Sequence, residues 1–353
     1  MSAKIDRKPG TAMTNWITRM IEVPTVDATS SARDDVATIG HRVGYDYINI
    51  YRYNGDYESD QAVDSRIDGI TAAVSGDDYL IHQYPTNNGP RFETRFIDRL
   101  NWRGTKIIIW VHDVESLRNQ CPDGFDEYAY FNKAAALIVP NPATEQVLKA
   151  HGVTVPMVAH YIFDYLDDTP LPAPAATRQL VFAGNLDKSA FLGDWTQSVP
   201  VTVFGIANGG LADKLAANPQ IDYRGALYRN ELNAALGQGL GLVWDLDSAY
   251  GNFFTYTKYI NPYKLTLYLS HGLPVIVSDE AAVAPFVTAN HLGFAVHAIA
   301  DIDGLLAAQS DDDLKKLTAR VVRFAALLRT GSFTQRALLA AHQVVAFGTV
   351  QYD

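Results

Sequence analysis

Short apolar runs alternate with amphipathic segments along the first half of the chain. The apolar runs are rich in β-branched residues and end at polar residues, as buried strands do. Strands are predicted for residues 46–51, 79–83, 106–112, 137–140 and 155–160. The stretches between them, such as 31–43 and 91–100, have helical spacing. Buried strands that alternate with helices predict a parallel α/β sheet.

A segment rich in proline and alanine, residues 167–177 (DDTPLPAPAAT), has the composition of a linker. Beyond it the same rhythm resumes, with strands predicted at 179–182, 201–204, 221–224, 240–244, 274–278 and 293–296 and closing helices at 311–328 and 334–346. Two α/β halves predict two Rossmann-like domains facing a cleft. Ligands of such sheets bind beyond the carboxyl ends of the strands.

Composition agrees with a globular protein of this size. The chain has 353 residues, 48% hydrophobic and 19% charged, which excludes collagen-like, disordered and coiled-coil classes. About 150 residues per domain predicts two domains. We expect neither a membrane-spanning segment nor a secretory signal, because no suitable apolar run is present. A single cysteine, Cys121, excludes an internal disulfide framework and a multi-cysteine zinc site, so we expect a cytoplasmic protein.

The charge balance limits the partners. Lys and Arg number 29 against 39 Asp and Glu, which gives a net charge of −10. A broadly acidic protein binds nucleic acids and anionic membranes poorly, so no nucleic-acid partner is expected. An anionic ligand must instead be held by a few well-placed cations.

The segment 261–278 (NPYKLTLYLSHGLPVIVS) carries the first such cation. Asn261 suits the N-cap of a helix and Pro262 its first position, which places Lys264 in the first turn. Backbone N–H groups at a helix start favour an anion, so Lys264 is a candidate diphosphate clamp. The alternative is a surface lysine on an ordinary helix.

A second candidate anion site follows the strand predicted at 179–182. Gly184 allows close approach of a ligand, Asn185 can cap the next helix, and Lys188 lies in its first turn. An ordinary strand–helix turn explains the same residues. The motifs G-x-G-x-x-G and G-x-x-x-x-G-K-[ST] are both absent from the sequence, which disfavours a dinucleotide dehydrogenase and a P-loop NTPase.

Two further strand ends carry groups that could do chemistry. Asp245 and Asp247 could hold a divalent metal against a diphosphate, or could be solvated loop residues. No metal is expected, because two lysines are available to neutralise phosphates. His112 and Asp113 could deprotonate a sugar hydroxyl. The alternative for this pair is structural, with Asp113 capping a helix and His112 making a core hydrogen bond. The polar loop 82–88 (HQYPTNN) has a composition suited to binding a sugar.

Several segments together resemble one bacterial family of GT-B glycosyltransferases. They are YKLTLYLSHGLPVIV, LVFAGNLDKSAFL, GLVWD, IIIWVHDVESLR, RIDGI and GSFTQRALL. The family includes the glucosyltransferase that extends O-linked N-acetylglucosamine on streptococcal serine-rich-repeat adhesins, and relatives labelled β-1,6-galactofuranosyltransferases. The resemblance extends over nearly the whole chain beyond about residue 15.

The resemblance implies a domain plan. It comprises an acceptor-side domain (1–166), a linker (167–177), a UDP-sugar-binding domain (178–330) and a C-terminal helix that returns to the first domain (331–353). It also implies metal-independent transfer and a homo-oligomer, expected to be a tetramer. Lys264 falls on the family's diphosphate-binding lysine and Tyr223 on a tyrosine beside the nucleotide. Lys188 replaces an arginine, which keeps the charge but loses bidentate geometry. The predicted donor site is Gly184, Asn185, Lys188, Tyr223, Asn261, Tyr263 and Lys264.

The predicted function is transfer of a hexose, glucose or galactofuranose, from a UDP-sugar to a hydroxyl of a sugar on a glycoprotein or surface polysaccharide. Asp113 and His112 are the candidate catalytic residues. Beyond the donor substrate, no cofactor is expected. Two alternatives remain: a non-catalytic partner subunit that binds a nucleotide-sugar or glycan, and a nucleotide-sugar epimerase.

Overall fold

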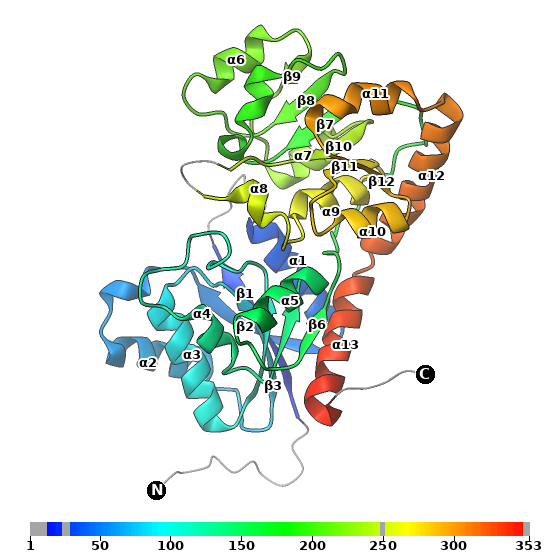
Figure 1. Cartoon of the computed structure of the whole chain (residues 1–353). Coiled ribbons are helices and arrows are strands. Elements are labelled where there is room, and N and C mark those ends of the chain that lie inside the picture. Colours follow the sequence, from blue (N-terminus) through cyan, green and yellow to red (C-terminus); the bar gives the residue numbers. More distant parts are fainter. Residues whose placement is uncertain (1–12, 23–28, 248–250, 349–353) are drawn as a thin grey trace, which may run out of the picture. The chain divides into compact units, whose positions relative to one another are not determined.

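The computed structural model describes residues 13–22, 29–247 and 251–348, and they form two compact units (Figure 1). Unit 1 comprises the described residues 13–22, 33–160 and 333–348. Unit 2 comprises 29–32, 161–247 and 251–332. The division falls between His160 and Tyr161, so the proline-rich residues 167–177 lie inside unit 2. There the Thr318 hydroxyl donates to the Ala175 carbonyl oxygen at 3.1 Å.

Unit 1 is built on a six-stranded parallel sheet in the order β2-β1-β3-β4-β5-β6. The strands are β1 (Asn15–Ile21), β2 (Tyr45–Tyr51), β3 (Tyr79–Tyr84), β4 (Lys106–Val111), β5 (Ala136–Val139) and β6 (Met157–Ala159). The helices are α1 (Thr29–Arg42, of which residues 33–42 belong to unit 1), α2 (Asp60–Ile70), α3 (Pro90–Arg103), α4 (Glu127–Phe131), α5 (Pro142–Ala150) and α13 (Ser332–Phe347, from residue 333 onward). Helices cover the sheet, and residues 107–111 of β4 are therefore completely buried.

Unit 2 contains a second six-stranded parallel sheet, in the order β12-β11-β10-β7-β8-β9. Its strands are β7 (Leu180–Ala183), β8 (Val201–Phe204), β9 (Ile221–Tyr223), β10 (Leu240–Val243), β11 (Val275–Ser278) and β12 (Gly293–Val296). Its helices are α6 (Leu211–Ala217), α7 (Arg229–Ala235), α8 (Phe253–Tyr256), α9 (Tyr263–Ser270), α10 (Ala284–Ala289), α11 (Ile302–Ala307) and α12 (Asp311–Leu328). The predicted parallel α/β class is confirmed in both halves.

The predicted strands are all present, with ends shifted by at most two residues, but β1 was missed. Its sequence, NWITRMI, mixes polar and apolar residues and lacks the continuous apolar run that marked the others. The strand lies between β2 and β3, and its Thr18 side chain is fully buried. Tertiary hydrogen bonds to Thr18, described below, compensate for burying this polar residue.

Helix α13 packs on unit 1 although it follows unit 2 in the sequence. His342 Nε2 lies 2.7 Å from the Tyr45 hydroxyl, and its ring stacks on Tyr79 with centroids 4.4 Å apart. Arg336 donates to the Ala159 carbonyl oxygen at 2.9 Å. Within the described residues, no helix combines the length and apolar content needed to cross a lipid bilayer.

Each sheet has one point where the strand order reverses. In unit 1 it lies between β1 and β3, and in unit 2 between β7 and β10. In sheets of this kind, the connections leave the two neighbouring strands toward opposite faces, and ligands generally bind at the carboxyl ends of these strands. The two reversal points are therefore the places at which candidate residues must be sought.

Candidate active site

Lys264 lies at the reversal point of the unit 2 sheet. It is the second residue of α9, and its ammonium nitrogen Nζ reaches the ends of both β7 and β10. Nζ donates to the Trp244 carbonyl oxygen at 3.2 Å and to Asp245 Oδ1 at 2.7 Å. It also lies 4.9 Å from the centroid of the Phe182 ring. A Cβ atom added at Gly184 would stand 3.7 Å from Nζ, so the fold brings Lys264 and Gly184 together.

The start of α9 differs from the expectation by one residue. Pro262 is extended, with φ −63° and ψ 130°, and is the N-cap, so the helix begins at Tyr263. Asn261 is buried, and its side-chain Nδ2 donates to the Tyr161 carbonyl oxygen at 2.9 Å. The prediction that Asn261 caps the helix was therefore wrong, because a tertiary hydrogen bond engages its amide. Tyr263 stacks on Tyr165, with ring centroids 5.5 Å apart.

Close packing fixes α9 against the sheet. A Cβ at Gly241 would lie 2.1 Å from Tyr268 Cγ, so only glycine allows the helix to approach β10 this closely. The Ala183 backbone N–H donates to the Tyr268 hydroxyl at 2.7 Å, which ties the helix to the end of β7. Lys264 thus projects from a rigid support, as a preorganised anion contact requires.

The turn after β7 has the predicted cap but a different helix. Asn185 Oδ1 accepts from the Asp187 backbone N–H at 2.9 Å and caps a short 3₁₀ helix, 186–188. Lys188 is the last residue of this helix, and its Nζ lies 4.0 Å from the centroid of the Phe253 ring on α8. This contact places Lys188 against α8.

Tyr223 ends β9, two strands from β7. Its hydroxyl donates to the Gly205 carbonyl oxygen at 3.0 Å. Gly205 has φ 150°, and a Cβ there would stand 2.1 Å from the Gly184 carbonyl oxygen. Glycine is required where the two strand ends approach so closely. The carboxyl ends of β9, β8 and β7 therefore lie side by side at Tyr223, Gly205 and Gly184.

Both aspartates considered for a metal site have protein partners. Asp245 forms the ion pair with Lys264, and Asp247 accepts from the Thr255 backbone N–H at 3.1 Å and from its hydroxyl at 2.8 Å. Among the described residues, no group of three or more His, Cys, Asp or Glu side chains could hold a metal ion. The observed role of Asp247 is to anchor the start of α8.

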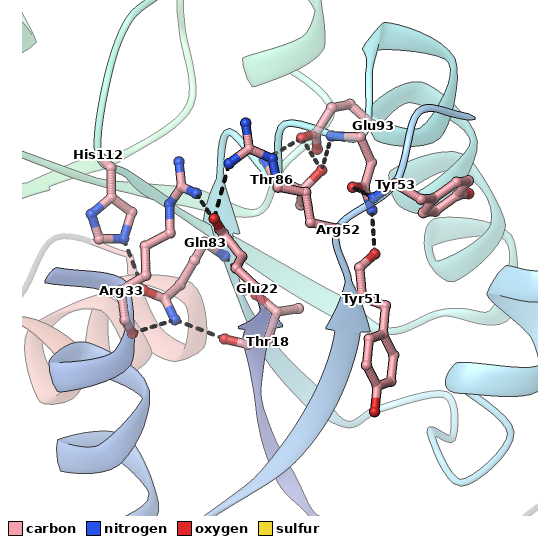
Figure 2. Close-up of polar contacts among 11 residues, drawn as sticks. Thr18, Glu22, Arg33, Tyr51, Arg52, Tyr53, Gln83, Thr86, Glu93 and His112 are labelled. Carbon is pink, nitrogen blue, oxygen red and sulfur yellow. Dashed lines mark hydrogen bonds and ion pairs between the residues drawn. The ribbon is translucent and has the colours of Figure 1, made fainter. Parts of the chain in front are cut away.

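At the reversal point of the unit 1 sheet, Gln83 joins three segments of the chain (Figure 2). Its backbone N–H donates to the Thr18 hydroxyl at 2.8 Å. Its side-chain Nε2 donates to the carbonyl oxygens of Thr18, at 2.7 Å, and Arg33, at 3.1 Å. Its Oε1 lies 2.8 Å from His112 Nε2. This network positions His112 directly after β4.

Arg33 contributes a buried positive charge to the same edge. Its side chain is 2% exposed and pairs with Glu22, with Nη1 3.3 Å from Oε1 (Figure 2). Arg52 reaches the other oxygen of Glu22 at 3.0 Å. Burial, with Arg33 and His160 nearby, lowers the pKa of His112 well below its usual value. His112 is therefore a neutral imidazole at physiological pH.

The loop after His112 carries two carboxylates that share one arginine. Arg118 Nη1 lies 3.1 Å from Asp113 Oδ2, and Arg118 Nε lies 3.4 Å from Glu115 Oε2. Residues 115–119 form turns, so Asp113 caps no helix here. Buried Glu127 shapes the loop, because its carboxylate accepts the backbone N–H groups of Glu115 and Ser116, each at 2.8 Å.

Sequence reasoning missed Glu115. Burial raises its pKa to about 7, an effect that Arg118 opposes. Its Oε1 is buried and has no hydrogen-bond partner among the described residues. A carboxyl group that titrates near neutrality at a strand end is a candidate for proton transfer. The only sequence signal is its position two residues after Asp113.

The segment 82–88, predicted as a polar loop, begins inside β3, which ends at Tyr84, and all of its residues except Asn87 are buried. His82 Nε2 lies 2.9 Å from Glu93 Oε2, and the Thr86 hydroxyl donates to Glu93 Oε1 at 2.7 Å. The side chains of His82, Thr86 and Asn88 are completely buried. The contacts of His82 and Thr86 are structural, because they compensate for the buried Glu93 carboxylate.

The two parallel α/β units define a GT-B glycosyltransferase fold, as solved structures show. The chain is similar to the solved protein structure described as "Trehalose-6-phosphate from E. coli bound with UDP-2-fluoro glucose". The TM-score is 0.60 at 11% identity, and the match covers 94% of this chain and 99% of that chain. It is similar to T4 phage BGT in complex with UDP and Mn²⁺, with a TM-score of 0.55, 13% identity, and coverage of 94% and 99%. At these identities, the likeness concerns the fold.

The chain belongs to the Glucosyltransferase 3-like family, whose N-terminal domain matches residues 14–162 and whose C-terminal domain matches residues 180–341. It is 29% identical over 319 residues to Glucosyltransferase 3 of Streptococcus gordonii, covering 88% of this chain and 92% of that protein. It is also 29% identical over 237 residues to beta-1,6-galactofuranosyltransferase WbbI of Escherichia coli (strain K12), covering 65% and 68%. The predicted family and the glycosyltransferase class are confirmed.

Proposed function

We propose that the chain transfers glucose or galactofuranose from a UDP-sugar to a hydroxyl of a sugar on a glycoprotein or surface polysaccharide. The observation that carries this proposal is the position of Lys264 beside Gly184, at the reversal point of the unit 2 sheet. A cation next to a glycine at such a point suits the diphosphate of a nucleotide-sugar. The names of the relatives support glucose and galactofuranose as the sugars.

In the proposed reaction, the acceptor oxygen forms a bond to the anomeric carbon as the bond to the donor phosphate breaks. UDP leaves with the bonding electron pair, and Lys264 and Lys188 stabilise its negative charge without a metal ion. Where the anomeric configuration inverts, the acceptor proton passes to Asp113 or His112. We assign donor binding to residues 178–330 and acceptor activation to residues 1–166.

The cellular setting is part of the proposal. We propose that the enzyme works in the cytoplasm, where UDP-sugars are available, and that it assembles as a homotetramer. The acidic net charge of −10 supports a glycan or glycoprotein acceptor rather than a nucleic acid. Size-exclusion chromatography with light scattering tests the oligomeric state.

A donor and acceptor screen tests the function. UDP-glucose, UDP-galactose, UDP-galactofuranose and UDP-N-acetylglucosamine are each offered with glycosylated acceptors, and UDP release and product mass are measured. Transfer from one of the first three donors supports the proposal. Interconversion of the donor without transfer would indicate an epimerase. Donor binding without either reaction, across a broad acceptor panel, would indicate a partner subunit.

A further inference from the structure

Gln83 is held in one orientation by groups that can only accept hydrogen bonds. The carbonyl oxygens of Thr18 and Arg33 both contact its side-chain nitrogen, at 2.7 and 3.1 Å. A carbonyl oxygen cannot donate, so both must face the NH₂ group of the amide. The Gln83 side chain is completely buried, and an amide flip would set two buried carbonyls against its oxygen. Oε1 is therefore the atom that faces His112.

The orientation of Gln83 determines where His112 carries its proton. Oε1 lies 2.8 Å from His112 Nε2 and has no hydrogen to offer, so Nε2 must donate. His112 is neutral, as shown above, and a neutral imidazole has only one N–H. The lone pair must then be on Nδ1, and the ring is a proton acceptor at that atom.

We propose that Gln83 is a positioning residue that holds His112 in the Nε2–H tautomer, so that Nδ1 accepts the proton of the acceptor hydroxyl. This inference rests on the proposed function and chooses His112 over Asp113 for that step. As the acceptor oxygen bonds to the anomeric carbon, its proton moves to the Nδ1 lone pair and UDP departs with the electron pair. The resulting imidazolium keeps its Nε2–H donated to Gln83.

The charged groups around His112 are compatible with this role. Arg33 of α1 and His160 after β6 both disfavour the imidazolium, and they keep the ring unprotonated before reaction. Asp113 follows His112 directly in the chain and is paired with Arg118. Glu22 pairs with Arg33 and limits its effect on the ring. Gln83 thus fixes which ring nitrogen carries the proton without placing a carboxylate against the imidazole.

Nitrogen NMR of the full-length protein, labelled at its histidines, tests the tautomer without any assay of activity. The His112 signal is identified by its loss in His112→Gln. We expect the pattern of an Nε2–H tautomer at pH 7.5. An Nδ1–H tautomer, or a ring protonated at both nitrogens, would overturn the inference. The tautomer can be measured even if no UDP-sugar proves to be a donor. A failure of this inference can therefore be distinguished from a failure of the proposed function.

Two variants of Gln83 test the positioning role. Gln83→Met has similar volume but no hydrogen bonds, and we expect mixed tautomers and at least a tenfold lower kcat. Gln83→Glu places a carboxylate beside Nε2 and favours the imidazolium, so the acidic limb of the kcat–pH profile should move to higher pH. Gln61→Met, at an exposed position of α2, is the matched control and should change neither measurement.

Folding and donor binding are checked in the same variants. Thermal unfolding and UDP affinity identify a variant that is damaged globally. In that case the tautomer measured in the wild-type protein still decides whether His112 carries its proton on Nε2. A folded Gln83→Met protein with unchanged kcat, pH profile and tautomer would refute the role of Gln83. A normal tautomer together with full activity of His112→Gln would refute proton transfer to Nδ1.

Discussion

Lys264 and Asp245 form an ion pair at the reversal point of the unit 2 sheet, with Nζ 2.7 Å from Oδ1 and side chains that are 14% and 15% exposed. Asp245 offsets the cost of burying the ammonium group and holds it at the ends of β7 and β10. Its negative charge would also oppose a bound diphosphate. In the proposed donor site, the phosphate contact would use the ammonium hydrogen of Lys264 that Trp244 and Asp245 do not engage.

Removal of both members of this pair should weaken UDP binding without leaving a buried charge unpaired. A charge-assisted contact contributes about 1.5–3 kcal/mol, so Lys264→Met with Asp245→Asn should raise the UDP Kd roughly 10- to 100-fold. Asp245→Asn alone should preserve or increase the affinity for UDP, because Lys264 remains and the opposing negative charge is removed. Lys258→Met removes an exposed lysine and serves as control. Isothermal titration calorimetry showing unchanged affinity in the folded double variant would exclude Lys264 from the site.

Transfer should not depend on a divalent metal. Asp245 and Asp247 are engaged by Lys264 and Thr255, and the lysines supply the positive charge that a metal would otherwise bring. Initial rates measured in excess EDTA should equal those in added Mg²⁺ or Mn²⁺. A rate that collapses on chelation and returns with Mn²⁺ would instead identify the two aspartates as metal ligands.

Substitution of His112 should separate catalysis from donor binding. Removal of a general base costs roughly 10²–10⁴ in rate. His112→Gln should lower kcat by at least about a hundredfold and leave UDP affinity unchanged, because the proposed donor contacts all lie in unit 2. Asp123→Asn, at an exposed loop position, is a control for general effects on the protein. A weaker UDP affinity of His112→Gln, measured by calorimetry, would contradict the assignment of donor binding to unit 2 and proton transfer to unit 1.

Glu115 should make stability fall as pH rises. Its pKa in the folded protein is about 7 against an ordinary value of 4.5, so between these values the folded chain holds a proton that the unfolded chain has lost. Glu115→Gln should therefore stabilise the protein by about 1–3 kcal/mol at pH 8 and much less at pH 5. Thermal and urea unfolding at both pH values measure the difference. Equal effects at the two values would show that the carboxyl does not titrate in this range.

An ion-pair ladder joins α2 to α3 and should respond to salt. Asp64 pairs with Arg95 at 2.5 Å, and Asp68 pairs with both Arg99 and Arg103. These groups are partly exposed, so Asp68→Asn should cost only about 0.5–1 kcal/mol at low ionic strength and less in 1 M NaCl. Urea unfolding of the wild type and the variant at both salt concentrations gives the comparison. A loss that is independent of salt would indicate a packing defect.

Local pattern was sufficient for most elements of the fold. Continuous apolar runs predicted β4 and β11, because strands covered on both faces need apolar residues at every position. The strand β1 was not predicted from the sequence, because its buried Thr18 is stabilised by Gln83, which is 65 positions away in the chain. A polar residue at a buried position is acceptable only where a distant partner exists, and such a partner is not encoded locally.

The sequence by itself determined the α/β class, the family and the candidate lysines, because periodicity, strand-end glycines and family segments are properties of contiguous residues. The tertiary structure alone decided which candidates meet. It placed Lys264 beside Gly184 and Asp245, turned Asn261 toward Tyr161, and set Lys188 against Phe253. It also buried Glu115 and fixed the tautomer of His112 through Gln83. Burial and hydrogen-bond partners set proton affinity, and both arise only when segments remote in sequence are packed together.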